Sequence, residues 1–290
     1  MKFGKFGVFT MTDALNAGQL GDMVARLEDL GYSTLWYPEA VTYETFALGS
    51  YLLSQSTRLN VASGIANIYA RDPAAAASGH NTLNSLYDGR FVLGLGVSHP
   101  VLVSDMRGHE YKHPLSAMRD YLDGMDKAWA AMGGVPAQKQ VVLAALGPKM
   151  SQLAAERTLG AFPYNITPEQ AGISRSNMGP DAAIICEQKV LLCTDPVKAR
   201  EVARASLGFY MPMPNYFKNW FRLGFNEDDL KDGGSDRLMD AMVFWGEADE
   251  IKEKLQQYFD GGADQVVIQP LRADGQAGPD WEALEAFAPN

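Results

Sequence analysis

The polar residues with the clearest chemical potential in this chain follow apolar runs that are typical of strands. Asn67 and Arg71 come after one such run, and Ser98 and His99 come directly after another. An imidazole suits proton transfer near neutral pH, so His99 is a candidate proton donor or acceptor. Because the carboxyl ends of parallel strands meet at one edge of a sheet, these side chains are predicted to gather at a single site.

A candidate anion site lies where Gly147, Pro148, Lys149 and Met150 open a helix directly after a strand. Free backbone amides and the positive end of the helix dipole make such a start a natural place for an anion. The run from Gly94 to His99 resembles the dinucleotide-binding pattern GxGxxG only superficially, because His99 stands where the third glycine belongs.

The elements that must position these residues alternate between strand and helix. Asp72-Pro73 and Asp195-Pro196 each combine a capping aspartate with a first-turn proline, which predicts two helix starts. Eight strand–helix repeats favour a closed (β/α)₈ TIM barrel over an open sheet, and we expect residues 1–290 to form one α/β domain. The eight predicted strands are 6–10, 34–37, 59–65, 91–96, 141–146, 161–164, 187–193 and 265–268.

Two segments, 167–183 and 209–240, exceed ordinary connections and are interpreted as insertions at the carboxyl-end mouth of the barrel. Residues 210–225 are rich in aromatic residues and methionine. This stretch is consistent either with core or dimer surface, or with part of a substrate pocket.

Composition excludes several classes of partner. A formal net charge of −10 argues against nucleic acid and anionic membrane surfaces, since both need a basic footprint. The two cysteines lack metal-ligand spacing, and no metal site is expected. No apolar stretch approaches the roughly 20 residues that span a bilayer. Met1 leads directly into a strand-like segment, so we expect a cytoplasmic protein without a signal peptide that acts on a small molecule.

Several blocks of the sequence resemble the bacterial luciferase-like monooxygenase superfamily, and the blocks occur in the same order as in that family. Among its branches, the chain looks most like the group that uses the deazaflavin coenzyme F420. The blocks are 57–64, 69–73 and 82–96, which form the signature, together with 31–39, 143–150 and 262–267.

This resemblance implies a (β/α)₈ barrel that transfers a hydride between C5 of coenzyme F420 and a small organic substrate. The alternatives are a flavin mononucleotide (FMN) monooxygenase that uses reduced flavin and oxygen, and a non-catalytic flavin-binding barrel subunit. Members of the family commonly form dimers, so a homodimer is expected.

The resemblance also implies which residues bind the cofactor. Relatives carry a non-prolyl cis peptide at the end of the third strand, which places a cis bond at Ser63–Gly64 or Gly64–Ile65. The residues implied to contact the cofactor are Ser63, Gly64, Ile65, Ala66, Asn67, Gly96, Val97, Ser98, Gly147, Pro148, Lys149, Met150 and Tyr164.

Two residues are the catalytic candidates. His99 stands where a related dehydrogenase has an acidic residue, and Glu39 matches an acidic residue that the family places close to the ring. Ala40 replaces a histidine that is frequent in relatives, which removes the usual catalytic imidazole. The alternative roles are a hydrogen bond within the loop for His99 and loop bracing for Glu39.

Overall fold

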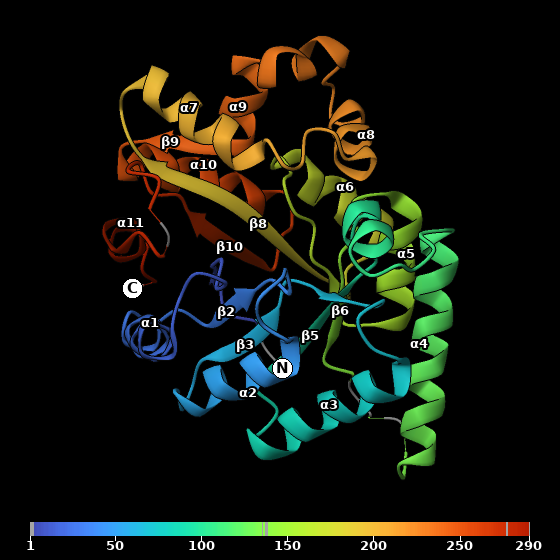
Figure 1. Ribbon diagram of the computed structural model, residues 1–290. Coiled ribbons are helices and arrows are strands. Elements are labelled where there is room, and N and C mark those ends of the chain that lie inside the picture. The colour runs from blue at the N-terminus through green and yellow to red at the C-terminus, as the bar shows by residue number, and fades with distance from the viewer. Residues whose placement is uncertain (1–2, 135, 137–138, 277, 290) are drawn as a thin grey trace.

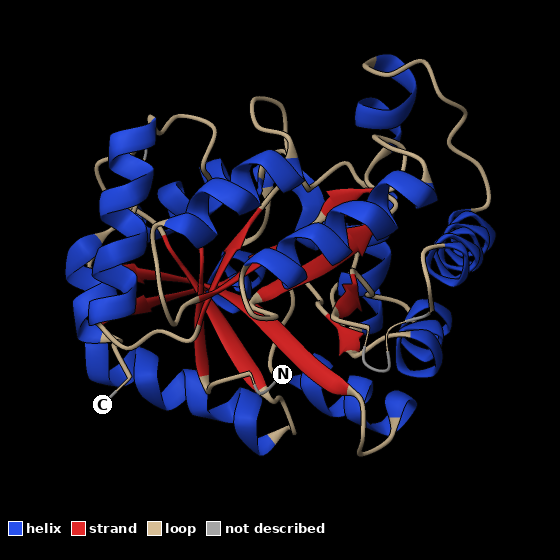
Figure 2. Ribbon diagram, turned by 90° about the horizontal axis from the view of Figure 1, so that it is seen from below, coloured by secondary structure: helices blue, strands red, loops and turns tan. Residues whose placement is uncertain are grey.

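Eight parallel strands close into a barrel in the computed structural model, which describes residues 3–134, 136, 139–276 and 278–289. Pairing of the last strand with both the first and the seventh completes the ring, and helices surround it (Figure 2). In order around the ring, the strands are β1 (Phe6–Phe9), β2 (Thr34–Tyr37), β3 (Asn60–Ser63), β5 (Phe91–Gly96), β6 (Val141–Leu143), β7 (Gly160–Ala161), β8 (Ala183–Leu192) and β10 (Gln265–Pro270).

Helices connect the strands and cover the outside of the barrel (Figure 1). The start of α3 shows why the sequence folds this way locally, because Asp72 accepts a hydrogen bond from Ala75 N and Pro73 occupies the first turn. The covering helices are α1 (Ala17–Asp29), α2 (Thr45–Ser54), α3 (Pro73–Leu86), α4 (Pro114–Ala131), α5 (Pro148–Arg157), α6 (Glu169–Met178), α7 (Pro196–Leu207), α10 (Ala248–Asp260) and α11 (Trp281–Ala286).

The interior of the barrel is filled by side chains that point inwards from successive strands. Trp36 stacks on Phe162 with ring centroids 4.3 Å apart, and Phe9 lies next to Phe162. A larger apolar layer between strands and helices surrounds this centre. The inside of the barrel is therefore a packed core, and a binding site is expected at the carboxyl ends of the strands.

A smaller apolar core belongs to the segment between α7 and α10, which lies at the top of Figure 1. This segment contains α8 (Pro214–Arg222), the 3₁₀ element η2 (Glu227–Gly233), α9 (Asp236–Met242) and β9 (Val243–Gly246). Strand β9 pairs with the outer end of β8. A π-helical turn, η1 (Val101–Asp105), and the two-residue strand β4 (Ala66–Asn67) follow β5 and β3 respectively.

The predicted TIM barrel is confirmed, with differences in detail. The third strand ends at Ser63 instead of residue 65, and the seventh begins at Ala183 instead of residue 187. The interpretation of 167–183 as an insertion is wrong, since α6 fills it as a regular crossover helix. Its serines, asparagine and glycine are weak helix formers and concealed it. Strand β9 was missed because it is a four-residue apolar run that directly follows a helix.

Candidate active site

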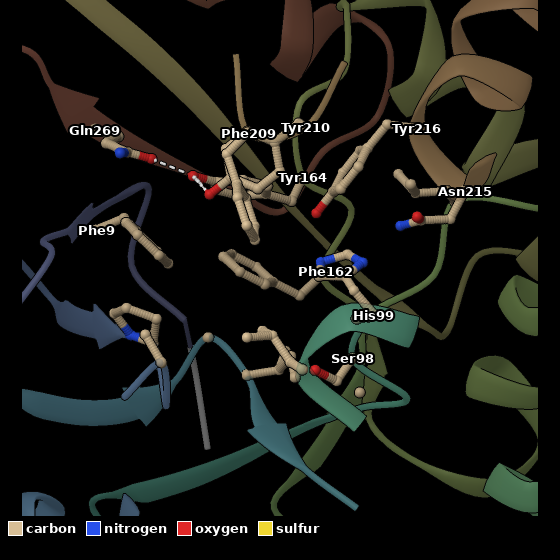
Figure 3. Close-up of a pocket in the computed structure, with 18 of the residues that line it drawn as sticks. Phe9, Ser98, His99, Phe162, Tyr164, Phe209, Tyr210, Asn215, Tyr216 and Gln269 are labelled. Atoms are coloured by element: carbon tan, nitrogen blue, oxygen red, sulfur yellow. Dashed lines mark hydrogen bonds between the residues drawn. The ribbon is translucent and has the colours of Figure 1, made fainter. Parts of the chain in front are cut away.

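A cavity of about 900 Å³ opens at the carboxyl ends of the barrel strands (Figure 3). Residues at or just beyond the ends of most barrel strands line it, as the topology of a parallel barrel predicts. Helix α8 and the end of α7 form the opposite wall. The strand-end residues are Phe9, Glu39, Gly64, Ile65, Gly96, Val97, Ala144, Phe162, Tyr164 and Gln269, and those of the opposite wall include Ala205, Phe209, Tyr210, Asn215, Tyr216, Lys218 and Arg222.

The floor of the cavity is an apolar surface built where β3 and β5 end, and Gly64, Ile65, Gly96 and Val97 line it. A Cβ atom on Gly94 would lie 2.0 Å from the carbonyl oxygen of Ser63, and one on Gly96 would lie 2.5 Å from the side chain of Ile65. Both positions therefore require glycine. The Gly64–Ile65 peptide bond is cis, which confirms the prediction of a cis bond at this point.

The predicted cofactor residues fall into two groups. Eight of them line the cavity: Gly64, Ile65, Gly96, Val97, Ser98, Gly147, Met150 and Tyr164. The others do not line it. The Ser63 hydroxyl donates to Gly94 O at 2.9 Å, Asn67 Oδ1 accepts from Tyr69 N at 2.9 Å, and Ala66 is buried. Pro148 and Lys149 are exposed on α5. These five residues support the floor and the helix start from outside the cavity.

Glu39 lines the cavity, but both oxygens of its carboxylate are already engaged. Oε2 accepts from Asn67 N at 2.8 Å and from Arg71 Nη1 at 3.1 Å. Oε1 accepts from Thr45 N at 3.2 Å and from the second terminal nitrogen of Arg71. This geometry ties the loops after β2 and β3 together, and so gives Glu39 a bracing function. Its catalytic role stays a prediction.

His99 lies at the rim of the cavity between aromatic side chains. Ser98, directly before it, has a φ of +56°, a left-handed turn that directs the chain away from β5. The imidazole centroid lies 5.6 Å from that of Tyr216 and 6.2 Å from that of Phe209. Burial lowers the pKa of His99, and the side chain of Asn215 opposes this shift. Its Nδ1 is buried without a hydrogen-bond partner in the described part of the chain.

A group of tyrosines forms the wall opposite the floor. Tyr164 donates its hydroxyl to Gln269 Oε1 at 2.9 Å, and its oxygen lies 3.3 Å from the hydroxyl of Tyr210. Figure 3 shows both tyrosines over the cavity, with Tyr216 beside them. The stretch 210–225 was expected either in the core or a dimer surface, or in a substrate pocket, and its residues Tyr210 and Tyr216 line the cavity.

A buried ion pair supports this wall from behind, and sequence reasoning missed it. Lys189 and Glu187 on β8 are each 1% exposed, and Lys189 Nζ lies 3.0 Å from Glu187 Oε1 and 4.0 Å from the Tyr164 ring centroid. Lys189 also donates to Asn165 Oδ1. Burial lowers the pKa of Lys189, while Glu187 opposes the shift. The available signal was a pair of charges, two residues apart, in an otherwise apolar strand.

The start of α5 forms a polar corner of the cavity. No side chain caps this helix, and Gly147 lines the cavity at its first turn. Arg222 Nη2 lies 3.7 Å from the position that a Cβ on Gly147 would occupy. Arg222 donates to Asn219 Oδ1 at 2.9 Å and forms no ion pair with the described residues. Lys218, one turn earlier on α8, lines the same flank. This corner therefore suits an anion.

The described residues contain no group of three or more His, Cys, Asp or Glu side chains arranged to hold a metal ion. No helix among them is long and apolar enough to cross a membrane.

Comparison with known proteins agrees with this architecture. A curated relative, a putative coenzyme F420-dependent oxidoreductase of Mycobacterium tuberculosis, is 23% identical over 85% of this chain and 89% of its own length. The coenzyme F420-dependent tetrahydromethanopterin reductase of Methanopyrus kandleri superposes with a TM-score of 0.78 at 17% identity, covering 98% of this chain and 97% of that one.

Another solved structure, an F420-dependent secondary alcohol dehydrogenase in complex with an F420–acetone adduct, superposes with a TM-score of 0.77 at 13% identity. The superposition covers 99% of this chain and 97% of that one. At such identities these structures establish the shared fold alone. Residues 1–265 match the family described as luciferase-like monooxygenases, so the chain belongs to the luciferase-like monooxygenase family.

Proposed function

We propose that this protein is an oxidoreductase that binds coenzyme F420 in the barrel mouth and catalyses hydride transfer between it and a small organic substrate. The observation that carries the proposal is the pairing of an apolar floor with a polar, cationic corner in one cavity. The names of the related enzymes support the choice of coenzyme.

The floor fits the tricyclic ring of a deazaflavin. Ile65 and Val97 give it an apolar surface, and Gly96, which lines the cavity, adds no side chain to it. A planar ring needs such a surface because contact over its whole face excludes water and gains dispersion energy. Phe162 and Phe9, which also line the cavity, add aromatic surface around the same space.

The polar corner fits the phosphate of the cofactor. The start of α5, which no side chain caps, and the Arg222 guanidinium lie next to the same residue, Gly147. Arginine and free helix-start amides are the groups that proteins most often use for phosphates. Lys218 continues the cationic flank, where the acidic tail that distinguishes F420 from FMN would find a partner.

When bound, coenzyme F420 supplies the carbon that accepts or donates the hydride, and the protein supplies position and proton transfer. His99 is the proposed proton acceptor or donor, because it lies at the rim with a free ring nitrogen. Glu39 holds the loops after β2 and β3 in place through Arg71 and Asn67.

The test is a fluorescence titration of the protein with F420 and with FMN. The proposal expects the smaller dissociation constant for F420, because the cationic flank has more anionic groups to meet. The Arg222→Gln variant should weaken F420 binding at least about tenfold, since it loses a charge-assisted hydrogen bond. Arg119→Gln, which changes an exposed arginine of α4 outside the cavity, is the matched control.

An equal or smaller dissociation constant for FMN would overturn the proposal in favour of a flavin monooxygenase. Tight F420 binding without hydride exchange for any alcohol, aldehyde or ketone would instead favour a binding subunit without catalysis.

A further inference from the structure

Helix α8 brings one side chain of the 209–240 insertion over the cavity in a fixed position. Pro214 occupies the first turn of this helix, and Tyr216 and Trp220 are buried one turn apart on the same face. The Trp220 indole donates to Asn165 O at 2.9 Å, which fastens α8 to the loop after β7. Since Trp220 anchors the helix, the position of Tyr216 is set by the barrel itself.

The hydroxyl of Tyr216 forms no hydrogen bond with any described residue, although the side chain as a whole is only 7% exposed. Figure 3 shows this hydroxyl pointing into the cavity towards His99. Burial, together with Tyr210 and Glu187, raises the pKa of Tyr216 well above its ordinary value. The group therefore stays protonated and can donate a hydrogen bond.

His99 lies beside Tyr216 in the cavity, with the two ring centroids 5.6 Å apart. Its Nδ1 is also without a partner among the described residues. Polar groups in an apolar site usually have partners, because an unpaired buried donor or acceptor costs free energy. The Tyr216 hydroxyl points into the cavity towards His99 and has no partner among the described residues, so a polar atom of a bound molecule placed between the two side chains would supply one.

Next to Tyr216 and His99, this wall is aromatic or already satisfied, and its two cationic side chains, Lys218 and Arg222, belong to the polar corner at the start of α5. Phe209 and Phe162 contribute aromatic surface, and the hydroxyl of Tyr164 is engaged by Gln269. The one cation behind the wall, Lys189, is enclosed and paired with Glu187. An anionic group placed here would lose its hydration without gaining a free positive charge, so this part of the cavity selects against carboxylates and phosphates.

We propose that Tyr216 and His99 together bind the oxygen atom of a neutral, largely apolar alcohol or carbonyl compound, which is the substrate class of this site. This inference rests on the proposed function for the identity of the hydride acceptor. Tyr216 donates a hydrogen bond to the substrate oxygen and sets its orientation. His99 exchanges the proton of that oxygen.

The proton and electrons balance as follows for an alcohol. The O–H bond breaks, its proton passes to the free ring nitrogen of His99, and its electron pair forms the new C=O bond. The C–H bond of the carbon that carries this oxygen also breaks, and its hydride passes to the coenzyme of the proposed function. A neutral imidazole is the form that can accept this proton, and the burial that lowers the pKa of His99 favours that form.

The experiment compares three probes that share a ring and differ in the polar group: cyclohexanone, methylcyclohexane and cyclohexanecarboxylate. Their binding is measured by saturation-transfer NMR, with the protein saturated with oxidised F420 and again without it. The wild type should bind cyclohexanone more tightly than methylcyclohexane by roughly 3- to 12-fold, the usual net effect of one hydrogen bond. Cyclohexanecarboxylate should bind most weakly.

Tyr216→Phe removes only the hydroxyl and keeps the ring. This variant should lose the preference for the ketone while binding methylcyclohexane as the wild type does. Tyr51→Phe removes a hydroxyl that bonds Ala17 O outside the cavity, and should keep the preference.

A Tyr216→Phe variant with an unchanged ketone preference would overturn the inference, and so would tighter binding of the carboxylate. The two claims are separable. Failure of F420 to bind refutes the proposed function, while the comparison without F420 still decides whether Tyr216 recognises the oxygen.

Discussion

The two sides of the cavity are built by different principles. The barrel side consists of strand ends where glycines and small apolar residues pack so closely that Gly94 and Gly96 have no room for a Cβ. Its carboxylate, Glu39, is fully engaged by Arg71 and backbone amides. The opposite side comes from the end of α7 and from α8. It presents aromatic rings, with the hydroxyl of Tyr216 unpaired among the described residues, and it carries Arg222 and Lys218 at the polar corner.

This difference indicates that the two sides of the cavity have different functions in binding. A closely packed surface whose carboxylate is fully engaged suits one partner, such as the flat ring of a cofactor. On a wall of aromatic rings with an unpaired hydroxyl, the side chains of an insertion determine which substrate binds. The following changes should therefore act differently on the two sides.

The largest effect is expected from Gly94→Ala on the barrel side. The added Cβ would meet the Ser63 carbonyl oxygen at 2.0 Å, and backbone at this depth has little room to move. We expect a loss of about 3 kcal/mol in the free energy of unfolding, together with loss of cofactor binding. Thermal denaturation and a cofactor titration measure both.

Gly18→Ala serves as the control, because its Cβ meets only the Asn16 side chain, at 3.4 Å. If Gly94→Ala were as stable as Gly18→Ala, the close packing of the floor would be refuted.

His99→Ala should lower turnover by roughly 10²-fold or more while leaving the dissociation constant of the cofactor nearly unchanged, since general acid–base help is typically worth this much. Steady-state kinetics and fluorescence titration separate the two quantities. His109→Ala, which changes an exposed histidine of the neighbouring loop, should keep its turnover. Unchanged turnover in His99→Ala would show that another group transfers the proton.

Glu39→Gln should act on the barrel side as a whole. The buried carboxylate loses its ion pair with Arg71, although Arg71 keeps Glu44 at 3.0 Å. We expect a loss of about 2 kcal/mol in stability and a weaker cofactor complex with a slower rate. Glu285→Gln, at an exposed pair with Arg26, should cost less than about 1 kcal/mol. A Glu39→Gln variant with normal stability but no turnover would assign Glu39 to catalysis instead of bracing.

The smallest effect concerns pH. Because burial lowers the pKa of His99, the imidazole stays neutral to a lower pH than a free histidine does. The kcat/KM for oxidation of an alcohol should therefore fall only below about pH 6.5, the ordinary value for histidine. The profile should lose this acid limb in His99→Ala. An inflection above the ordinary value would show that His99 is stabilised as a cation and contradict its assignment as the base.

The parts of the fold predicted well were those whose signals are local. Strands β2 and β5 agree with the prediction at both ends, since each is a continuous apolar run bounded by turn residues. The start of α3 followed from Asp72 and Pro73. Helix α6 was missed because its residues are weak helix formers. Strand β9 was missed because a four-residue apolar run directly after a helix does not identify a strand, and its place is set by pairing with β8.

The site divides in the same way. Gly64, Gly96 and His99 follow strands directly, so their proximity could be predicted from chain order alone. Tyr216 and Arg222 reach the cavity only because α8 docks on the loop after β7 through Trp220 and Asn165. Lys189 lies in the polar run Glu187–Lys189 of β8, and nothing in the order of the residues showed that this run is buried. Contacts of this kind depend on long-range packing, which a periodicity in the sequence does not encode.

The most direct test of the separation between cofactor binding and substrate binding is one crossed measurement, which compares Arg222 at the polar corner with Tyr216 on the aromatic wall. The dissociation constant of F420 and the KM of cyclohexanol are determined for wild type, Arg222→Gln and Tyr216→Phe. Arg222→Gln should raise the dissociation constant of F420 at least about tenfold and change the KM of cyclohexanol less than about twofold. Tyr216→Phe should raise the KM of cyclohexanol by roughly 3- to 12-fold and leave the dissociation constant of F420 unchanged. If either variant moved both constants by the same factor, cofactor binding and substrate binding would not be separate and the account would be wrong.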